Sequence, residues 1–76
     1  MDITQTLKEL VANEAGLPVE EISADQKFES FNLDSLSVVS LAFELENATG
    51  IAQIDPTVFT EYNTINKLAA WVNSQK

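Results

Sequence analysis

Residues 34–50 read DSLSVVSLAFELENATG and hold the strongest helix signals in the chain. Asp and Ser are favoured at helix N-caps, and Gly is favoured just beyond a helix C-terminus. At about 100° per residue, the apolar side chains of this segment fall into two separate stripes. One stripe holds Val38, Leu41, Ala42 and Leu45, and the other holds Leu36, Val39 and Phe43. The segment predicts a helix from Ser35 to about Thr49 with two apolar faces.

The two stripes have different explanations. A bundle helix needs one apolar stripe to reach the core, and the stripe that includes Leu41 and Leu45 is of the usual kind. The second stripe allows two interpretations that periodicity does not separate. In the first, it packs against a short third helix and the long loop that precedes Ser35. In the second, it stays partly exposed as a docking face for other proteins.

The flanking sequence predicts three further helices. Helical spacing of Ile3, Leu7, Leu10 and Val11, a possible cap at Asp2 and a stop at Gly16 indicate a helix over residues 2–15. Pro56 fits the first turn of a short helix near residues 57–61. A last helix over residues 64–74 follows from the spacing of Ile65, Leu68, Ala69 and Val72.

Residues 16–33 lack a sustained period and predict a long loop. A single turn is expected near Pro18–Ile22, with Phe28 and Phe31 anchoring the loop on the core. The fold class is therefore all-α: a small four-helix bundle with three longer helices, one short third helix and a long loop between the first two. The length predicts one domain over residues 1–76.

Composition narrows the function classes. The chain has no Cys and no His, so it forms no disulfide and lacks both residue types on which structural zinc sites are built. A net charge of −8 disfavours nucleic acid and anionic membranes and favours basic patches on proteins. With no signal peptide and no apolar run long enough for a bilayer, a soluble cytoplasmic monomer is expected. Met1 favours a free-standing protein, with an excised domain as the alternative.

Asp34-Ser35 allows a structural and a functional interpretation. Asp-Ser pairs start many helices, so Asp34 as a cap and Ser35 as an ordinary first-turn residue explain the pair. A phosphate ester on Ser35 would, however, lie near the positive end of the helix dipole, close to unpaired backbone N–H groups. The site thus favours an anionic attachment without requiring one.

The run FNLDSLSVV at residues 31–39 resembles the attachment signature of acyl and peptidyl carrier proteins. The resemblance extends over essentially the whole chain, through its length, its acidity, the long loop, Gly50 and the Thr64-Ile65-x-x-Leu68 pattern. It implies that Ser35 receives 4′-phosphopantetheine from coenzyme A by the action of a phosphopantetheinyl transferase, with Asp34 helping the transferase to bind and orient the site. The arm would then carry cargo as a thioester, through a thiol that this chain lacks.

The resemblance also implies a docking face and a set of partners. Leu36, Val39 and Phe43 match the positions where carrier proteins meet their enzymes, and Glu44 and Glu46 would attract basic residues on those enzymes. The expected partners are the transferase, an acyl- or aminoacyl-loading enzyme and a downstream synthase or transferase. The chain itself would be a non-catalytic carrier. Ser40 stands where fatty-acid carriers tend to have an acid, which puts fatty-acid synthase partners in doubt.

One departure from the family pattern concerns the turn before Ser35, and one further similarity concerns the cargo. Asn32 replaces the Gly common in fatty-acid carriers, and Asn tolerates the left-handed conformation better than most residues. The stretch FTEYNTINKL at residues 59–68 resembles D-alanyl carrier proteins. We therefore expect an amino acid or a short acyl starter as cargo, in polyketide or nonribosomal peptide biosynthesis or a related pathway.

Two other function classes remain as alternatives. An acidic interaction module without a covalent arm would share the charge and the second apolar stripe, but it would not need a serine at residue 35. An enzyme is disfavoured because the sequence offers no His, no Cys, no Gly-rich phosphate loop and no metal-ligand spacing.

Overall fold

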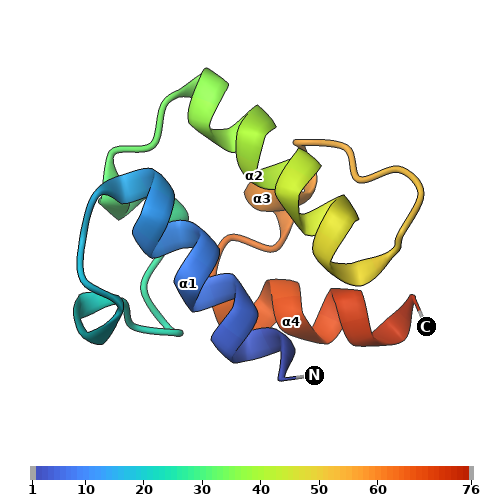
Figure 1. Ribbon diagram of the computed structural model, residues 1–76, viewed down its shortest axis with the longest axis horizontal. Helices are drawn as coiled ribbons and strands as arrows, with labels where there is room; N and C mark the ends of the chain where they lie inside the picture. Colours follow the sequence, from blue (N-terminus) through green and yellow to red (C-terminus); the bar gives the residue numbers. More distant parts are fainter. Residues whose placement is uncertain (1, 76) are drawn as a thin grey trace.

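The computed structural model describes residues 2–75, and over this range the chain forms four α-helices (Figure 1). They are α1 (Ile3–Ala15), α2 (Ser35–Thr49), α3 (Val58–Glu61) and α4 (Ile65–Ser74). Two 3₁₀ helices, η1 (Val19–Glu21) and η2 (Phe28–Phe31), lie between α1 and α2. The predicted all-α bundle with a short third helix and a long first loop is confirmed.

The helices begin and end at the residues that the sequence indicated. Asp2 caps α1, because its Oδ1 accepts hydrogen bonds from the Thr4 and Gln5 N–H groups. Thr64 caps α4 by accepting from the Lys67 N–H at 3.2 Å. Gly16 and Gly50 adopt φ values of 70° and 77°, the left-handed conformation that ends α1 and α2.

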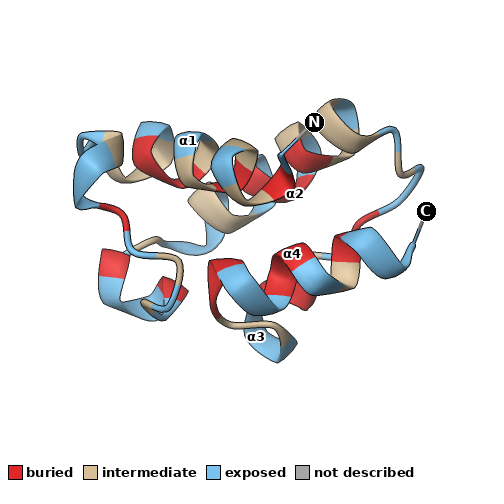
Figure 2. Ribbon diagram, turned by 90° about the horizontal axis from the view of Figure 1, so that it is seen from below, coloured by how far each residue is buried: buried red, intermediate tan, exposed pale blue. Residues whose placement is uncertain are grey.

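The core lies between α1, α2 and α4. Figure 2 shows the buried residues of these helices turned toward the interior of the molecule. The faces of α1 and α4 follow the predicted spacing, and α1 packs against both other long helices. The buried side chains of the three helices are Ile3, Leu7, Val11 and Ala12 of α1, Leu41, Ala42 and Leu45 of α2, and Ile65, Leu68, Ala69 and Val72 of α4.

The loop between α1 and α2 is ordered by its own apolar anchors and by the start of α4. η1 is the turn predicted near Pro18–Ile22, whereas η2 was not predicted. Phe28 and Phe31 are buried, as expected, and the Phe28 ring meets the Phe59 ring edge-on at 5.4 Å. The Phe28 N–H donates to the Asn63 carbonyl at 2.9 Å. These contacts bring the loop to a defined position just before Ser35.

A second tether joins the loop to α4. The Asn66 N–H donates to the Ala24 carbonyl at 3.0 Å, and the Asn66 side-chain amide donates to the Asp25 carboxylate. Lys27 and Thr64 also form an isolated antiparallel β-bridge. The loop that leads to Ser35 is therefore held by residues more than thirty positions further along the chain.

Candidate functional site

The turn that leads into α2 depends on Asn32. This residue ends η2 with φ 57° and ψ 36°, and it is the one non-glycine residue with positive φ among those described. The left-handed conformation is tolerated by Asn better than by most residues, as the sequence indicated. The turn directs the chain from the buried Phe31 outward to Asp34 and Ser35, both of which are exposed.

Asp34 is the N-cap of α2. Its Oδ1 accepts a hydrogen bond from the Ser37 N–H at 2.8 Å, the geometry predicted for a capping Asp. This hydrogen bond, with a smaller contribution from the Ser37 side chain, lowers the pKa of the Asp34 carboxyl below its ordinary value of 3.8. A negative charge is thus kept beside Ser35 at neutral pH.

Acidification is expected to remove the stabilisation that this cap provides. A carboxyl with a lowered folded-state pKa stabilises the fold fully above its unfolded-state pKa, and loses that contribution as the pH falls through the folded-state pKa. Nuclear magnetic resonance titration of the Asp34 carboxyl should give a midpoint below 3.8. Asp34→Asn keeps a capping oxygen without the titration, so its stability should fall less than that of the wild type between about pH 5 and about pH 2. Equal acid sensitivity of the two proteins would contradict the assignment.

Ser35 is the first residue of α2, and its side chain is exposed. Among residues 2–75 its hydroxyl has no hydrogen-bond partner, so no internal contact opposes its modification. A hollow of about 340 Å³ lies beside it. The residues that line the hollow are Leu33, Asp34, Ser35, Val38, Val39, Pro56, Thr57 and Thr60. A phosphate ester on Ser35 fits this place, because the helix dipole favours an anion there and the hollow leaves room for an extended group.

The second apolar stripe of α2 is exposed. The exposed fractions of Leu36, Val39 and Phe43 are 78%, 52% and 64%. Of the two interpretations that the sequence left open, packing against α3 and the loop is therefore wrong for these side chains. Val38, of the first stripe, is half-buried and contacts the core. The exposed stripe runs from the residue after Ser35 along the outer side of α2.

Glu46 makes an internal contact that the sequence did not predict. Its Oε2 accepts a hydrogen bond from the Ile54 N–H at 2.7 Å, across the connection between α2 and α3. Eight residues separate the two groups, and nothing in the helical pattern of α2 marks a backbone N–H beyond Gly50 as a partner. Glu46, which was predicted to attract partner enzymes, therefore also holds the connection between α2 and α3 through this hydrogen bond.

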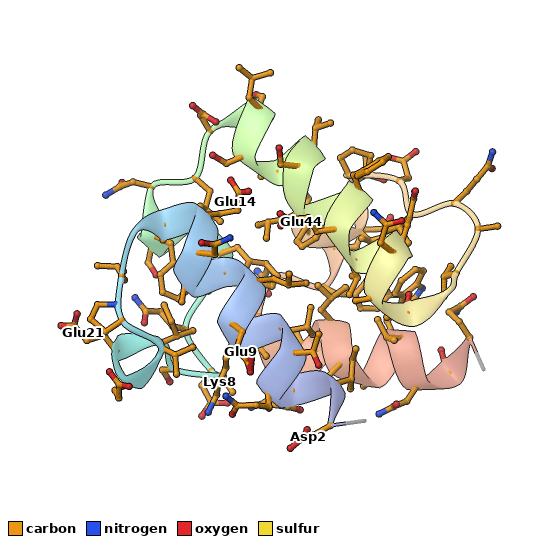
Figure 3. The ribbon with its side chains drawn as sticks, viewed as in Figure 1. Asp2, Lys8, Glu9, Glu14, Glu21 and Glu44 are labelled. Atoms are coloured by element: carbon orange, nitrogen blue, oxygen red, sulfur yellow. The ribbon has the colours of Figure 1, made fainter. Side chains whose placement is uncertain are left out.

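Glu44 is likewise not a freely exposed acid. Its side chain is half-buried on α2 (Figure 3), and its Oε2 is buried without a hydrogen-bond partner among the described residues. A buried carboxylate oxygen that lacks a partner weakens a fold, because the hydration lost on burial is not replaced.

Replacing Glu44 with methionine is expected to stabilise the protein by about 1 kcal/mol, because it removes the unpartnered oxygen and retains an unbranched side chain. Urea unfolding followed by circular dichroism would measure the change. Glu9→Met, at an exposed position of α1, is the matched control for removing one acid from an acidic chain. An equal gain in the control would assign the effect to net charge instead.

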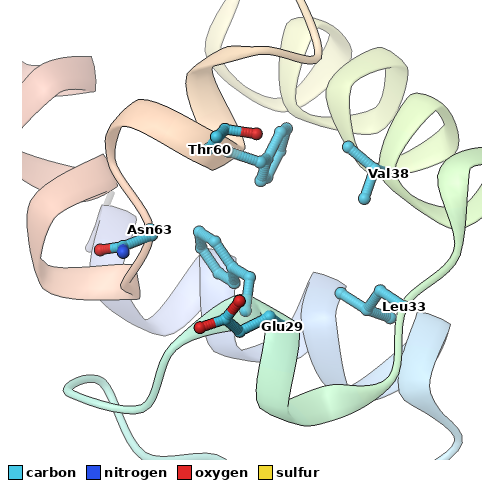
Figure 4. Close-up of a pocket in the computed structure, with 7 residues that line it drawn as sticks. Glu29, Leu33, Val38, Thr60 and Asn63 are labelled. Atoms are coloured by element: carbon cyan, nitrogen blue, oxygen red, sulfur yellow. The ribbon is translucent and has the colours of Figure 1, made fainter.

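A second hollow lies next to the one at Ser35 and was not predicted. It has a volume of about 260 Å³ and is lined by Phe28, Glu29, Leu33, Val38, Phe59, Thr60 and Asn63 (Figure 4). Leu33, Val38 and Thr60 line both hollows, so the two hollows adjoin. From the sequence only the apolar anchors of this region could be predicted, because the lining residues come from η2, α2, α3 and the connections beside them.

Residues 2–75 contain neither a cluster of metal-binding side chains nor a helix that could span a membrane. No group of three or more acidic side chains is arranged to hold a metal ion in this part of the chain. No helix within the same residues is both long and apolar enough to cross a membrane.

Comparison with known proteins identifies relatives of this chain. Residues 5–72 match the family described as phosphopantetheine attachment site. The non-reducing polyketide synthase adaA of Aspergillus niger is 38% identical over 64 residues, which cover 84% of this chain and 4% of the synthase. The mycoketide-CoA synthase of Mycobacterium tuberculosis is 34% identical over 56 residues, or 74% of this chain and 1% of that protein. The chain thus spans only a few per cent of the length of these curated relatives.

Solved structures of similar size share the fold. The crystal structure of a free-standing peptidyl carrier protein from Acinetobacter baumannii superposes with a TM-score of 0.89 and 37% identity, covering 96% of this chain and 90% of that one. The HMG-ACPI domain of the CurA module of Lyngbya majuscula gives a TM-score of 0.87 and 26% identity, covering 95% of this chain and 72% of that one. The family match covers nearly all of the residues described here. The chain therefore belongs to the phosphopantetheine attachment family, the carrier domains that bear a 4′-phosphopantetheine group.

Proposed function

We propose that this protein carries an acyl or aminoacyl group as a thioester on a 4′-phosphopantetheine arm attached to Ser35. The main support is the position of Ser35, an exposed serine at the head of α2 beside a hollow, within the region that matches the family. The bound arm supplies a thiol, which a chain without cysteine cannot provide itself.

The residues around Ser35 have separate roles in this proposal. The Ser35 hydroxyl, which is exposed, would attack the pyrophosphate of coenzyme A, form the phosphodiester and release adenosine 3′,5′-bisphosphate. Asp34 fixes the first turn of α2 through the Ser37 N–H and presents a negative charge to the transferase. Leu36, Val39 and Phe43 provide an apolar docking face, because an exposed apolar stripe is stabilised when a partner covers it.

The partners follow from the chemistry of a tethered thioester. A phosphopantetheinyl transferase installs the arm, a ligase, adenylation enzyme or acyltransferase loads it, and a synthase or transferase takes the cargo. The chain has no catalytic role of its own in this scheme, and it works in the cytoplasm as a single carrier domain. Relatives in polyketide synthases and a peptidyl carrier neighbour support polyketide or peptide biosynthesis. An amino acid or a short acyl starter remains the expected cargo.

The exposed stripe also favours a second candidate function. An acidic module that binds a basic partner without any arm would use the same three apolar side chains and the net charge of −8. The two functions differ in whether residue 35 is modified.

Intact-protein mass after incubation with coenzyme A and a promiscuous phosphopantetheinyl transferase tests the proposal. The wild type is expected to gain the mass of one phosphopantetheine, and fragmentation should place the group on Ser35. If a positive-control carrier is modified in the same experiment and this protein is not, the carrier function is refuted in favour of the interaction module.

A further inference from the structure

The backbone N–H groups that donate hydrogen bonds in the connection between α2 and α3 donate to side chains. Among residues 2–75, no backbone N–H from Ile51 to Thr57 donates to a backbone carbonyl. Instead, Ile51 donates to the Thr49 hydroxyl at 3.3 Å, Thr57 donates to the Asp55 carboxylate at 2.9 Å, and Ile54 donates to Glu46 at 2.7 Å. The first two contacts span two residues each and set only local turns.

The Glu46 contact differs because it links the middle of the connection to the last turns of α2. It joins groups eight residues apart and is partly buried, so water competes for it less than for an exposed hydrogen bond. A charged acceptor also gives a stronger hydrogen bond than a neutral one. The Ile54 side chain is buried at the same point. The contact therefore determines where the connection returns to the core.

The position of Ile54 affects one side of the hollow beside Ser35. Pro56 and Thr57 follow Ile54 within three residues, and both line the hollow. The Pro56 carbonyl accepts from the Phe59 N–H, and the Thr57 carbonyl accepts from the N–H groups that follow it in α3. Pro56 and Thr57 therefore move with the start of α3, and a shift at Ile54 would displace this end of α3 together with its side of the hollow. Glu46, near the end of α2, is thus linked through Ile54 and Pro56 to the hollow beside Ser35, at the beginning of α2.

We propose that Glu46 is a positioning residue for the phosphopantetheine site, acting through the Ile54 N–H on the Pro56–Thr57 wall of the hollow. The inference rests on the proposed function for the arm, and it assigns Glu46 a role as a hydrogen-bond acceptor rather than as a charge that attracts partners. The two roles are separable, because a glutamine keeps an acceptor oxygen and loses the charge.

The test compares Glu46→Ala, Glu46→Gln and the control Glu20→Ala, which removes one acid from an exposed position on η1. Amide hydrogen exchange of Ile54, Thr57 and Thr60 is measured on the unmodified proteins, and kcat/KM for transfer of the arm is measured at low and high salt. Glu46→Ala should raise the Ile54 exchange rate by about tenfold or more, since a hydrogen bond to a charged group is lost. The same variant should lower kcat/KM severalfold, and Glu46→Gln should largely restore both values.

Two results would overturn the proposal. If Glu46→Ala leaves the exchange of Ile54 and Thr57 unchanged, Glu46 does not hold the wall. If Glu46→Gln is as poor a transferase substrate as Glu46→Ala, and high salt brings the wild type to the same rate, Glu46 acts through its charge. A wild type that accepts no arm would refute the proposed function alone, because the exchange rates still decide whether Glu46 anchors the connection.

Discussion

Ser35→Ala is expected to abolish transfer of phosphopantetheine completely while leaving the fold intact. The variant removes the hydroxyl oxygen to which we propose that the arm is attached. The cost in stability should be within about 0.5 kcal/mol, because the hydroxyl is exposed and the cap of α2 is supplied by Asp34. Intact mass and circular dichroism measure the two quantities on the same samples.

Ser40→Ala is the matched control, because Ser40 is also exposed on α2 and lies five positions along the helix. It should gain the mass of one phosphopantetheine at the rate of the wild type. Equal modification of Ser35→Ala and the wild type would refute Ser35 as the attachment residue without refuting the family assignment, and fragmentation would then locate the modified residue.

Leu45→Ala is expected to destabilise the protein by about 3 kcal/mol, because Leu45 is fully buried in the middle of the core and its removal leaves a cavity. A chain of 76 residues has a total stability of roughly 4 to 11 kcal/mol, so the variant would lose a large part of it. Urea unfolding monitored by circular dichroism and by the fluorescence of Trp71, the single tryptophan, gives the change.

Phe43→Ala, two residues earlier on the same helix, is the control variant for Leu45→Ala. Although the truncation removes a larger side chain, Phe43 is 64% exposed, and its loss should change the free energy of unfolding by no more than about 0.5 kcal/mol. The variant should instead weaken binding to a partner enzyme. A loss of stability comparable to that of Leu45→Ala would show that the second stripe is part of the core, and the docking face would have to be abandoned.

The elements of this fold follow from local sequence signals. Asp2, Asp34 and Thr64 cap helices through side-chain oxygens, and Gly16 and Gly50 end them in the left-handed conformation. These effects act within one helical turn, so a single sequence contains all the information they need. The two stripes of α2 were predicted for the same reason. Periodicity could not decide which of them would be covered, since that depends on how α1 and α4 pack.

The unpredicted parts of the site depend on contacts between distant segments. η2 is too short to show a helical period, and its position is set by Asn63 of the connection before α4. The donor in the hydrogen bond between Ile54 and Glu46 is a backbone N–H. Every residue except proline carries such a group, so the identity of residue 54 does not predict this hydrogen bond. The same limit applies to the two hollows, which are lined by residues of η2, α2, α3 and the connections beside them.

The tethers from the first loop to Asn63 and Asn66 have a consequence for the order of folding. Asn66 lies 41 residues beyond Asp25, so closing this contact requires a large loss of chain entropy that local helix formation does not. During synthesis, the chain must therefore extend beyond Asn66 before the segment that leads to Ser35 can adopt its folded conformation. A nascent chain would expose Ser35 before the contacts with Asn63 and Asn66 can form, so the proposed attachment site would be complete only after this part of the chain has been made.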